Sequence, residues 1–269
     1  MSLSVPALLA AGMMAAYGVV AAVVVREGRR ARIGVGALVR GVPSTVRSGL
    51  TLGLGDRVLR RLMLRSVLIG IVLSGVELLS PGTFATLLGG EERASGAYGL
   101  LTAAAFAASA GGAALAPVVA IRLGGGARAA RLVSWLAAPA ATLLAVPLLA
   151  AAGMGYVGIY LLLGIVGPLT SELLHDRVGS SERATMLSME SLTLQAGGVL
   201  SNLLIGALVT ATSTAAGFGV VALALLGSGV VLLGIRDAAR GNVTASDLSD
   251  GSAPETVGSA DRMGTAGAA

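Results

Sequence analysis

Seven long apolar stretches limit what this sequence can fold into. Each contains about 20 residues with few charges, which is long enough to cross a hydrocarbon core of about 30 Å as an α-helix. Backbone groups in lipid must form hydrogen bonds within their own segment, so we expect an all-α, polytopic integral membrane helix bundle. Adjacent stretches almost touch near Gly153 and Ser213, which predicts tight turns there. The stretches are 4–25, 66–88, 97–121, 132–152, 154–174, 186–211 and 214–235.

The composition agrees with a membrane protein and argues against several other classes. Hydrophobic residues make up 55% of the chain and charged residues only 12%, whereas a soluble domain carries roughly 25% charged residues. The chain has no cysteine and one histidine, His175, which excludes disulfides and leaves no cluster for a metal site. Catalytic spacings and phosphate-binding loops are also missing from the sequence. We therefore expect no enzyme activity, no metal and no cofactor.

The arginines indicate an orientation in the membrane. They lie in every second gap between the apolar stretches, as the positive-inside rule requires for seven crossings. The intervening gaps hold Glu91, Glu92 and Arg93, or no charge at all. We therefore expect a multi-pass protein of the cell membrane, with its amino terminus outside and its carboxyl terminus in the cytoplasm. The net charge of +5 thus reflects topology, and we expect no nucleic-acid partner.

The same pattern divides the chain into four parts. We expect a first transmembrane helix at 1–25, a basic cytoplasmic loop at 26–65, a six-helix transmembrane bundle at 66–235 and a disordered cytoplasmic tail at 236–269. The basic loop mixes arginines with aliphatic residues. Either part of it lies on the anionic inner leaflet, or it is a solvated linker.

Glu77 is the most informative polar residue, since it lies near the middle of the second stretch. A carboxylate at that depth is costly unless it is paired, protonated or in a wet cavity. Pro81 and Gly82 follow it and predict a break in the helix, a feature of transporter binding sites. Glu77 is therefore either a proton-coupling or cation-binding group, or its span is displaced so that it lies near an interface.

Two other stretches carry patterned residues. In the sixth, Ser188, Ser191, Gln195 and Asn202 share one helical face, which must line a cavity or form hydrogen bonds with another helix. In the third, small residues at four-residue spacing predict close helix packing: Ala104, Ala108, Gly112, Ala116 and Ala120. Acidic groups near the ends of the fifth and sixth stretches, including Glu190, are expected to be solvated and to pair with Arg177 and Arg183.

Two short motifs resemble loops of the major facilitator superfamily of transporters. The run Ser181-Glu182-Arg183-Ala184-Thr185-Met186-Leu187-Ser188 resembles the loop between helices ten and eleven of bacterial members. The segment 117–131, with Arg122 and Gly124, is similar to the basic loop between helices eight and nine, although Ile121 stands where an acidic residue is usual. The resemblance implies a carboxyl-terminal half, from helix six to helix twelve. Glu77 would then lie on helix seven, and Gln195 and Asn202 on helix eleven.

By this resemblance the chain is a secondary active transporter, either a permease or an efflux protein, for a small organic solute. The carboxylate of Glu77 favours proton coupling, and Glu77, Ser191, Gln195 and Asn202 are the candidates for substrate or proton binding. A site between two halves requires a homodimer or a separate amino-terminal half as partner, besides the lipid bilayer and the solute. The alternatives are a truncated product without transport activity and a membrane scaffold or permease subunit of a larger complex.

Overall fold

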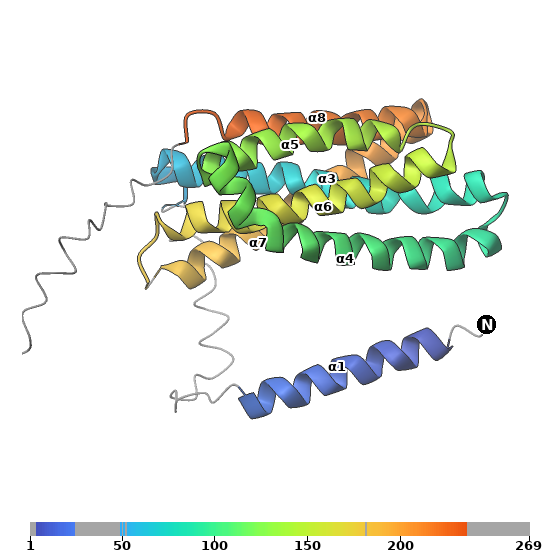
Figure 1. The fold of residues 1–269 in the computed structure, drawn as a ribbon, viewed down its shortest axis with the longest axis horizontal. Helices are drawn as coiled ribbons and strands as arrows, with labels where there is room; N and C mark the ends of the chain where they lie inside the picture. The colour runs from blue at the N-terminus through green and yellow to red at the C-terminus, as the bar shows by residue number, and fades with distance from the viewer. Residues whose placement is uncertain (1–3, 25–48, 50, 52, 181, 236–269) are drawn as a thin grey trace, which may run out of the picture. The chain divides into compact units, whose positions relative to one another are not determined.

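The structure is a computed structural model that describes residues 4–24, 49, 51, 53–180 and 182–235. Most of the expected basic loop and the whole expected tail lie outside these residues. The chain divides into two units, residues 1–51 and 52–269. The first contains α1, the 21-residue helix Ser4–Val24, which coincides with the first apolar stretch (Figure 1). Its exposed side chains include Leu8, Met13 and Tyr17.

The second unit contains six helices in its described part. They are α3 (Arg57–Leu88), α4 (Glu91–Leu123), α5 (Gly126–Leu143), α6 (Leu149–His175), α7 (Arg183–Ala211) and α8 (Thr214–Val231). All except α5 are long and apolar enough to cross a membrane. The described residues include no strand. For the described residues, the prediction of an all-α fold with several helices able to cross a membrane is therefore confirmed.

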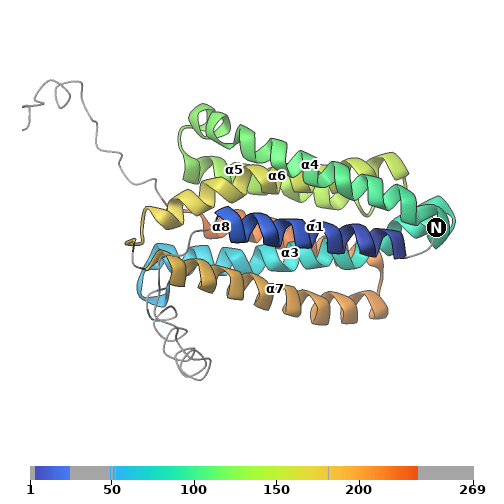
Figure 2. The ribbon, with the colours of Figure 1, turned by 90° about the horizontal axis from the view of Figure 1, so that it is seen from below.

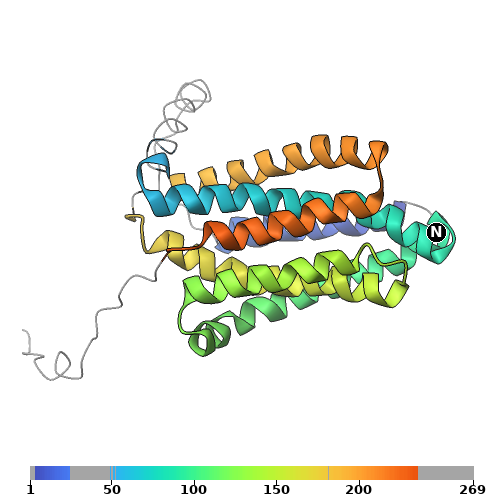
Figure 3. The ribbon, with the colours of Figure 1, turned by 90° about the horizontal axis from the view of Figure 1, so that it is seen from above.

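The six helices form three layers, as Figure 1 shows. The helices α5 and α8 lie side by side in one layer, α3 and α6 occupy the middle, and α4 and α7 form the other outer layer; Figures 2 and 3 show the same bundle from its two sides. The most extensive packing joins α4 to α6 and α3 to α7. When α3, α4 and α5 are exchanged in order for α6, α7 and α8, the packing of α4 on α6, α5 on α6 and α4 on α5 corresponds to that of α7 on α3, α8 on α3 and α7 on α8. The packing of α3 on α4 has no such counterpart between α6 and α7. The unit is thus built from two similar three-helix groups.

Glycines bring the backbones together in both of these helix pairs. Between α4 and α6, a Cβ on Gly112 would lie 2.2 Å from the carbonyl oxygen of Leu161. Between α3 and α7, a Cβ on Gly197 would lie 2.0 Å from the carbonyl oxygen of Val67. Only glycine permits such approaches, which stabilise helix pairs where lipid offers no hydrophobic driving force. The predicted close packing of the third stretch is confirmed at Gly112 and Ala116, which are buried, whereas Ala104 is exposed.

The helix α3 begins earlier than predicted, because residues 57–65 belong to it and not to the basic loop. Asp56 caps its start by accepting hydrogen bonds from the backbone N–H groups of Val58 and Leu59 at 2.7 and 2.9 Å. Leu59 and Leu62 are then buried at helical spacing, while the arginines between them point outward. The number of arginines here was a weaker guide than the helical period of the apolar residues.

The predicted break at Pro81 and Gly82 is wrong, because α3 continues through both residues to Leu88. Proline removes one backbone donor, but membrane helices tolerate it where neighbouring groups compensate. Two hydroxyl groups donate to backbone carbonyls around this site: Thr83 to Leu79 at 2.9 Å and Thr86 to Gly82 at 2.9 Å.

One of the two predicted turns is confirmed and the other is wrong. Ser213 caps α8, and its side chain accepts a hydrogen bond from the backbone N–H of Ala216 at 3.3 Å. Gly153 instead lies inside α6, and the turn occurs at 144–148. Pro147 explains the difference, since the residue before a proline avoids the helical conformation. The span predicted at 132–152 is correspondingly replaced by α5, which ends at Leu143.

Trp135, the single tryptophan of the chain, reports on the contact between α5 and α8. Its indole N–H donates to the carbonyl oxygen of Leu226 at 3.2 Å, and its ring packs on Gly229, where a Cβ would lie 2.3 Å from Nε1. We expect Gly229→Ala to displace the indole, alter its fluorescence emission and cost about 1 kcal/mol of stability through the lost hydrogen bond. The matched change Gly227→Ala meets only an ordinary contact and should leave the emission unchanged. Equal spectra for the two variants would contradict this packing.

Candidate functional site

Glu77 lies on the exposed side of α3 within the six-helix unit. It is eleven residues from the carboxyl end of α3, or about 16 Å along the helix axis. Its carboxylate is near enough to Tyr98 of α4 and Tyr160 of α6 to interact with them electrostatically. Three helices therefore meet around this acidic group.

The tyrosines beside Glu77 belong to a larger aromatic cluster. Aromatic residues make up only 3% of the sequence, yet five of them pack together here. Tyr156 is 1% exposed, and its ring lies 5.7 Å from Tyr98 and 5.1 Å from Tyr160, measured between centroids. Its hydroxyl is 3.3 Å from the hydroxyl of Tyr98. Phe84 and Phe106 complete the cluster. The arrangement offers hydroxyl groups and ring faces next to a carboxylate.

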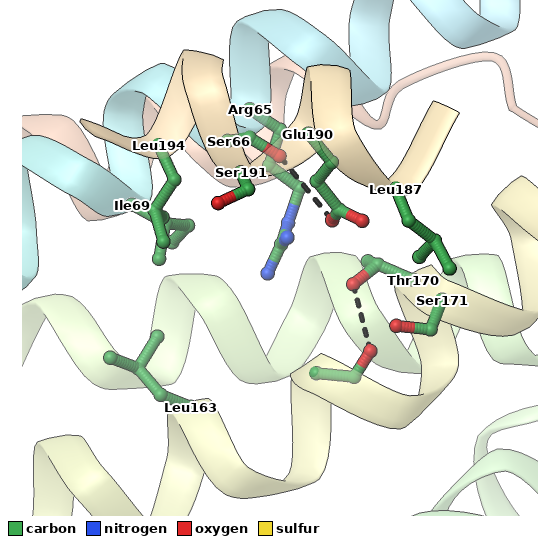
Figure 4. A pocket seen from close by; sticks show the side chains of 11 residues that line it. Arg65, Ser66, Ile69, Leu163, Thr170, Ser171, Leu187, Glu190, Ser191 and Leu194 are labelled. Atoms are coloured by element: carbon green, nitrogen blue, oxygen red, sulfur yellow. Dashed lines mark hydrogen bonds between the residues drawn. The ribbon is translucent and has the colours of Figure 1, made fainter. Parts of the chain in front are cut away.

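A cavity of about 300 Å³ lies between α3, α6 and α7 (Figure 4). We call it the Arg65 cavity. Its polar lining comes from Arg65 and Ser66 of α3, Thr170 and Ser171 of α6, and Glu190 and Ser191 of α7. The remaining lining residues are Ile69, Leu163, Gly167, Leu187 and Leu194. The cavity thus combines two charged groups and several hydroxyl groups with an apolar wall.

Arg65 is the most deeply buried charged group in the described part of the chain, at 5% exposure. Its guanidinium extends from α3 into the Arg65 cavity (Figure 4). Nε is buried and has no hydrogen-bond partner within the described residues. A buried cation is costly unless charge and hydrogen bonds compensate it, so this donor is an unusual feature of the interior.

Glu190 provides the opposite charge. The side chain of this half-buried residue interacts electrostatically with Arg65, and the hydroxyl of Ser66 lies 3.5 Å from its Oε1. The same hydroxyl also donates to the carbonyl oxygen of Leu62 at 3.1 Å. Glu190 therefore faces Arg65 inside the bundle, which differs from the predicted solvated pairing with Arg177 or Arg183.

The Arg65 cavity and the aromatic cluster lie along the same faces of α3 and α6. Ser66 and Glu77 are eleven residues apart on α3, close to three full helical turns, and Tyr160 and Ser171 have the same spacing on α6. Positions so related share one face of a helix. Two polar regions are therefore aligned where the two three-helix groups adjoin.

The predicted polar stripe of α7 is brought only partly into this region. Ser191 lines the Arg65 cavity, whereas Ser188, Gln195 and Asn202 are exposed on the six-helix unit. Ser188 donates to the carbonyl oxygen of Ala184 at 3.0 Å, within its own helix. The structure does not place these three residues beside Glu77.

The residues of the two sequence motifs lie at helix ends. Arg122 is exposed in the last turn of α4, and Arg183 is exposed at the start of α7. Gly124 ends α4 with a φ of 75°, in the left-handed region, and its N–H bonds to backbone carbonyls of the last turn.

Two groups of site residues were missed at the level of sequence, although signals for both existed. Arg65 was assigned to the basic loop, but it continues the buried face defined by Leu62 and Ile69, unlike the other arginines of that segment. Two members of the aromatic cluster, Tyr156 and Tyr160, are four residues apart, which places them on one face of a helix. The sequence does not indicate which helices pack against each other to form the cavity and the cluster.

Comparisons with known proteins leave the family of this chain open. Among the described residues, no group of three or more acidic or histidine side chains could hold a metal ion. No protein-family model matches the chain, and no curated protein is significantly similar to it.

Proposed function

We propose that the chain is one half of a secondary active transporter of the major facilitator type, carrying a small organic solute across the cell membrane with proton coupling. The observation that carries this proposal is the alignment of the aromatic cluster, with Glu77, and the Arg65 cavity along the adjoining faces of α3 and α6. Ionisable groups within membrane helices mark solute or proton pathways, because they are costly to keep there otherwise.

The construction from two similar three-helix groups supports the same proposal. Transporters of this type contain three-helix repeats within each six-helix half, and their substrate sites lie at the interfaces between repeats. A complete site then needs a second half, supplied by another copy of this chain or by a separate amino-terminal half. Glu77, exposed on α3, is the group we assign to proton coupling.

Proton-coupled flux in proteoliposomes tests this function. Vesicles containing the protein and an internal pH-sensitive dye are exposed to a panel of amino acids, sugars, organic acids and organic amines. At least one class should drive a pH change, and Glu77→Gln should reduce that change to background because the amide cannot carry a proton. Glu91→Gln, an exposed carboxylate at the first turn of α4, is the matched control and should retain flux.

Two results would contradict the proposal. If the unmodified protein gives no flux with any solute, either by itself or together with a separate amino-terminal half, a scaffold or subunit role is favoured instead. If Glu77→Gln retains full proton flux, transport stands but the assignment of Glu77 is wrong.

A further inference from the structure

We infer that the Arg65 cavity binds the carboxylate of a small organic monocarboxylate, and that protonation of Glu190 accompanies binding. The inference rests on the proposed function, since it names the class of solute carried. Its starting point is the guanidinium of Arg65, which is 5% exposed, enters the cavity and has an Nε donor without a partner in the described structure. The proposed function leaves the ligand of this cavity and the roles of Arg65 and Glu190 unassigned.

The donors of Arg65 determine the chemical group that fits. A guanidinium presents a planar fork of N–H groups that matches the two oxygens of a carboxylate or of a phosphate. The hydroxyl group of Ser191 lines the same space and can donate a hydrogen bond to such a ligand, whereas those of Ser66 and Thr170 already donate to backbone carbonyls of their own helices. A volume of about 300 Å³ is at the small end of the range for ligand sites, so the ligand is small.

The charge of the cavity favours a single negative charge. Arg65 and Glu190 are the charged groups among its lining residues, and α8, which also packs on α7, carries no ionisable side chain. With Glu190 ionised the cavity is neutral, and with Glu190 protonated it carries one positive charge. A monocarboxylate then restores neutrality, whereas a phosphate dianion would leave a buried negative charge.

The apolar wall indicates the rest of the ligand. Ile69, Leu163, Leu187 and Leu194 contribute aliphatic side chains to the lining, from α3, α6 and α7 (Figure 4). A short aliphatic or aromatic group attached to the carboxylate would bury apolar surface against them. Acetate, butyrate and benzoate therefore form a suitable series, and benzamide is the matched neutral analogue of benzoate.

Competition for Arg65 explains the role of the proton. The ionised carboxylate of Glu190 already attracts the guanidinium, so it opposes the arrival of a second carboxylate. A proton on Glu190 removes that negative charge and leaves the fork of Arg65 available. One proton and one monocarboxylate then enter the cavity together, with no change in its net charge.

Direct binding to the full-length protein in detergent tests the inference. Isothermal titration with acetate, butyrate and benzoate should detect binding that strengthens along the series, and benzamide and inorganic phosphate should bind weakly. Between pH 5.5 and 8 the dissociation constant for benzoate should rise by up to about tenfold per pH unit, as expected when one proton is taken up with the ligand.

Substitutions separate the two roles. Glu190→Gln should bind benzoate at pH 8 as tightly as the unmodified protein does at low pH, and its affinity should no longer change with pH. Arg65→Gln should lose binding and Arg65→Lys should retain part of it. The exposed residues Glu182 and Arg60 supply matched controls, Glu182→Gln and Arg60→Gln, which should behave like the unmodified protein.

Should Arg65→Gln fail to fold, the pH dependence of Glu190→Gln still decides. Absence of binding by all three monocarboxylates, preference for phosphate, or unchanged pH dependence in Glu190→Gln overturns the inference. Binding of benzoate without proton flux in proteoliposomes leaves the site standing and contradicts the transport function. Proton flux driven by another solute, without binding of any monocarboxylate, supports the transport function and contradicts the site.

Discussion

Gly197→Ala should destabilise the six-helix unit by about 1–3 kcal/mol, the usual cost of forcing extra atoms into a well-packed interior. The added Cβ would lie 2.0 Å from the carbonyl oxygen of Val67. This is a backbone atom, so it cannot move away unless the whole of α3 shifts. The contact is reciprocal, because a Cβ on Gly70 would lie 2.0 Å from the carbonyl oxygen of Leu194. Thermal unfolding in detergent, followed by the loss of monodisperse protein, measures the effect.

The control for this prediction lies on the same helix. A Cβ on Gly206 would meet nothing within 4 Å, so Gly206→Ala should leave the unfolding temperature unchanged or raise it, since alanine favours helix more than glycine does. The opposite signs exclude a general effect of alanine in α7. If both variants unfold at the same temperature, α3 and α7 do not pack as closely as described.

Ser95→Cys should react with a membrane-impermeant maleimide on intact cells, and Ser180→Cys should react only after lysis. The two serines lie at opposite ends of the bundle, in or beside the α3–α4 and α6–α7 turns, and both are exposed. Nine arginines of the six-helix unit gather at the end that contains Ser180: Arg57, Arg60, Arg61, Arg65, Arg122, Arg128, Arg131, Arg177 and Arg183. The positive-inside rule predicts that this end lies in the cytoplasm.

The unmodified protein is the negative control for this experiment, since it has no cysteine. Each variant therefore carries one reactive thiol, and the unmodified protein should remain unlabelled. Labelling of Ser180→Cys alone on intact cells would show that the bundle has the opposite orientation in the membrane. Labelling of both positions would mean that the two turns do not lie on opposite sides of a membrane.

The helices were predictable from sequence because lipid permits few alternatives. A long apolar run must become a helix, and the described structure has a helix at each predicted run. The limits agree to within four residues for α1, α7 and α8, whereas α3, α4 and α6 begin five to nine residues earlier than predicted. The errors arose where a local signal was weighed wrongly. The charges of the segment 57–65 led to its prediction as a loop, although it belongs to α3. Gly153 was predicted to form a turn, although Pro147 was the stronger signal.

The site was less predictable because it depends on contacts between distant segments. Glu77 stands out in the sequence as a charge within an apolar run. Its tyrosine neighbours come from α4 and α6, and the neighbour of Arg65, Glu190, is 125 positions away on α7. Helical spacing shows which residues share a face, but it does not show which helix that face meets.

The pairing of α3 with α7 has a consequence for biosynthesis. Helices enter the membrane in the order in which the ribosome makes them, so α3 and its Gly70 surface must remain in lipid until more than 100 further residues have been translated. The pair α4 and α6 can form earlier, because only α5 lies between them in the sequence. Assembly of the bundle therefore depends on a late step, in which α7 packs on the Gly70 surface of α3, the first helix of the unit to be inserted.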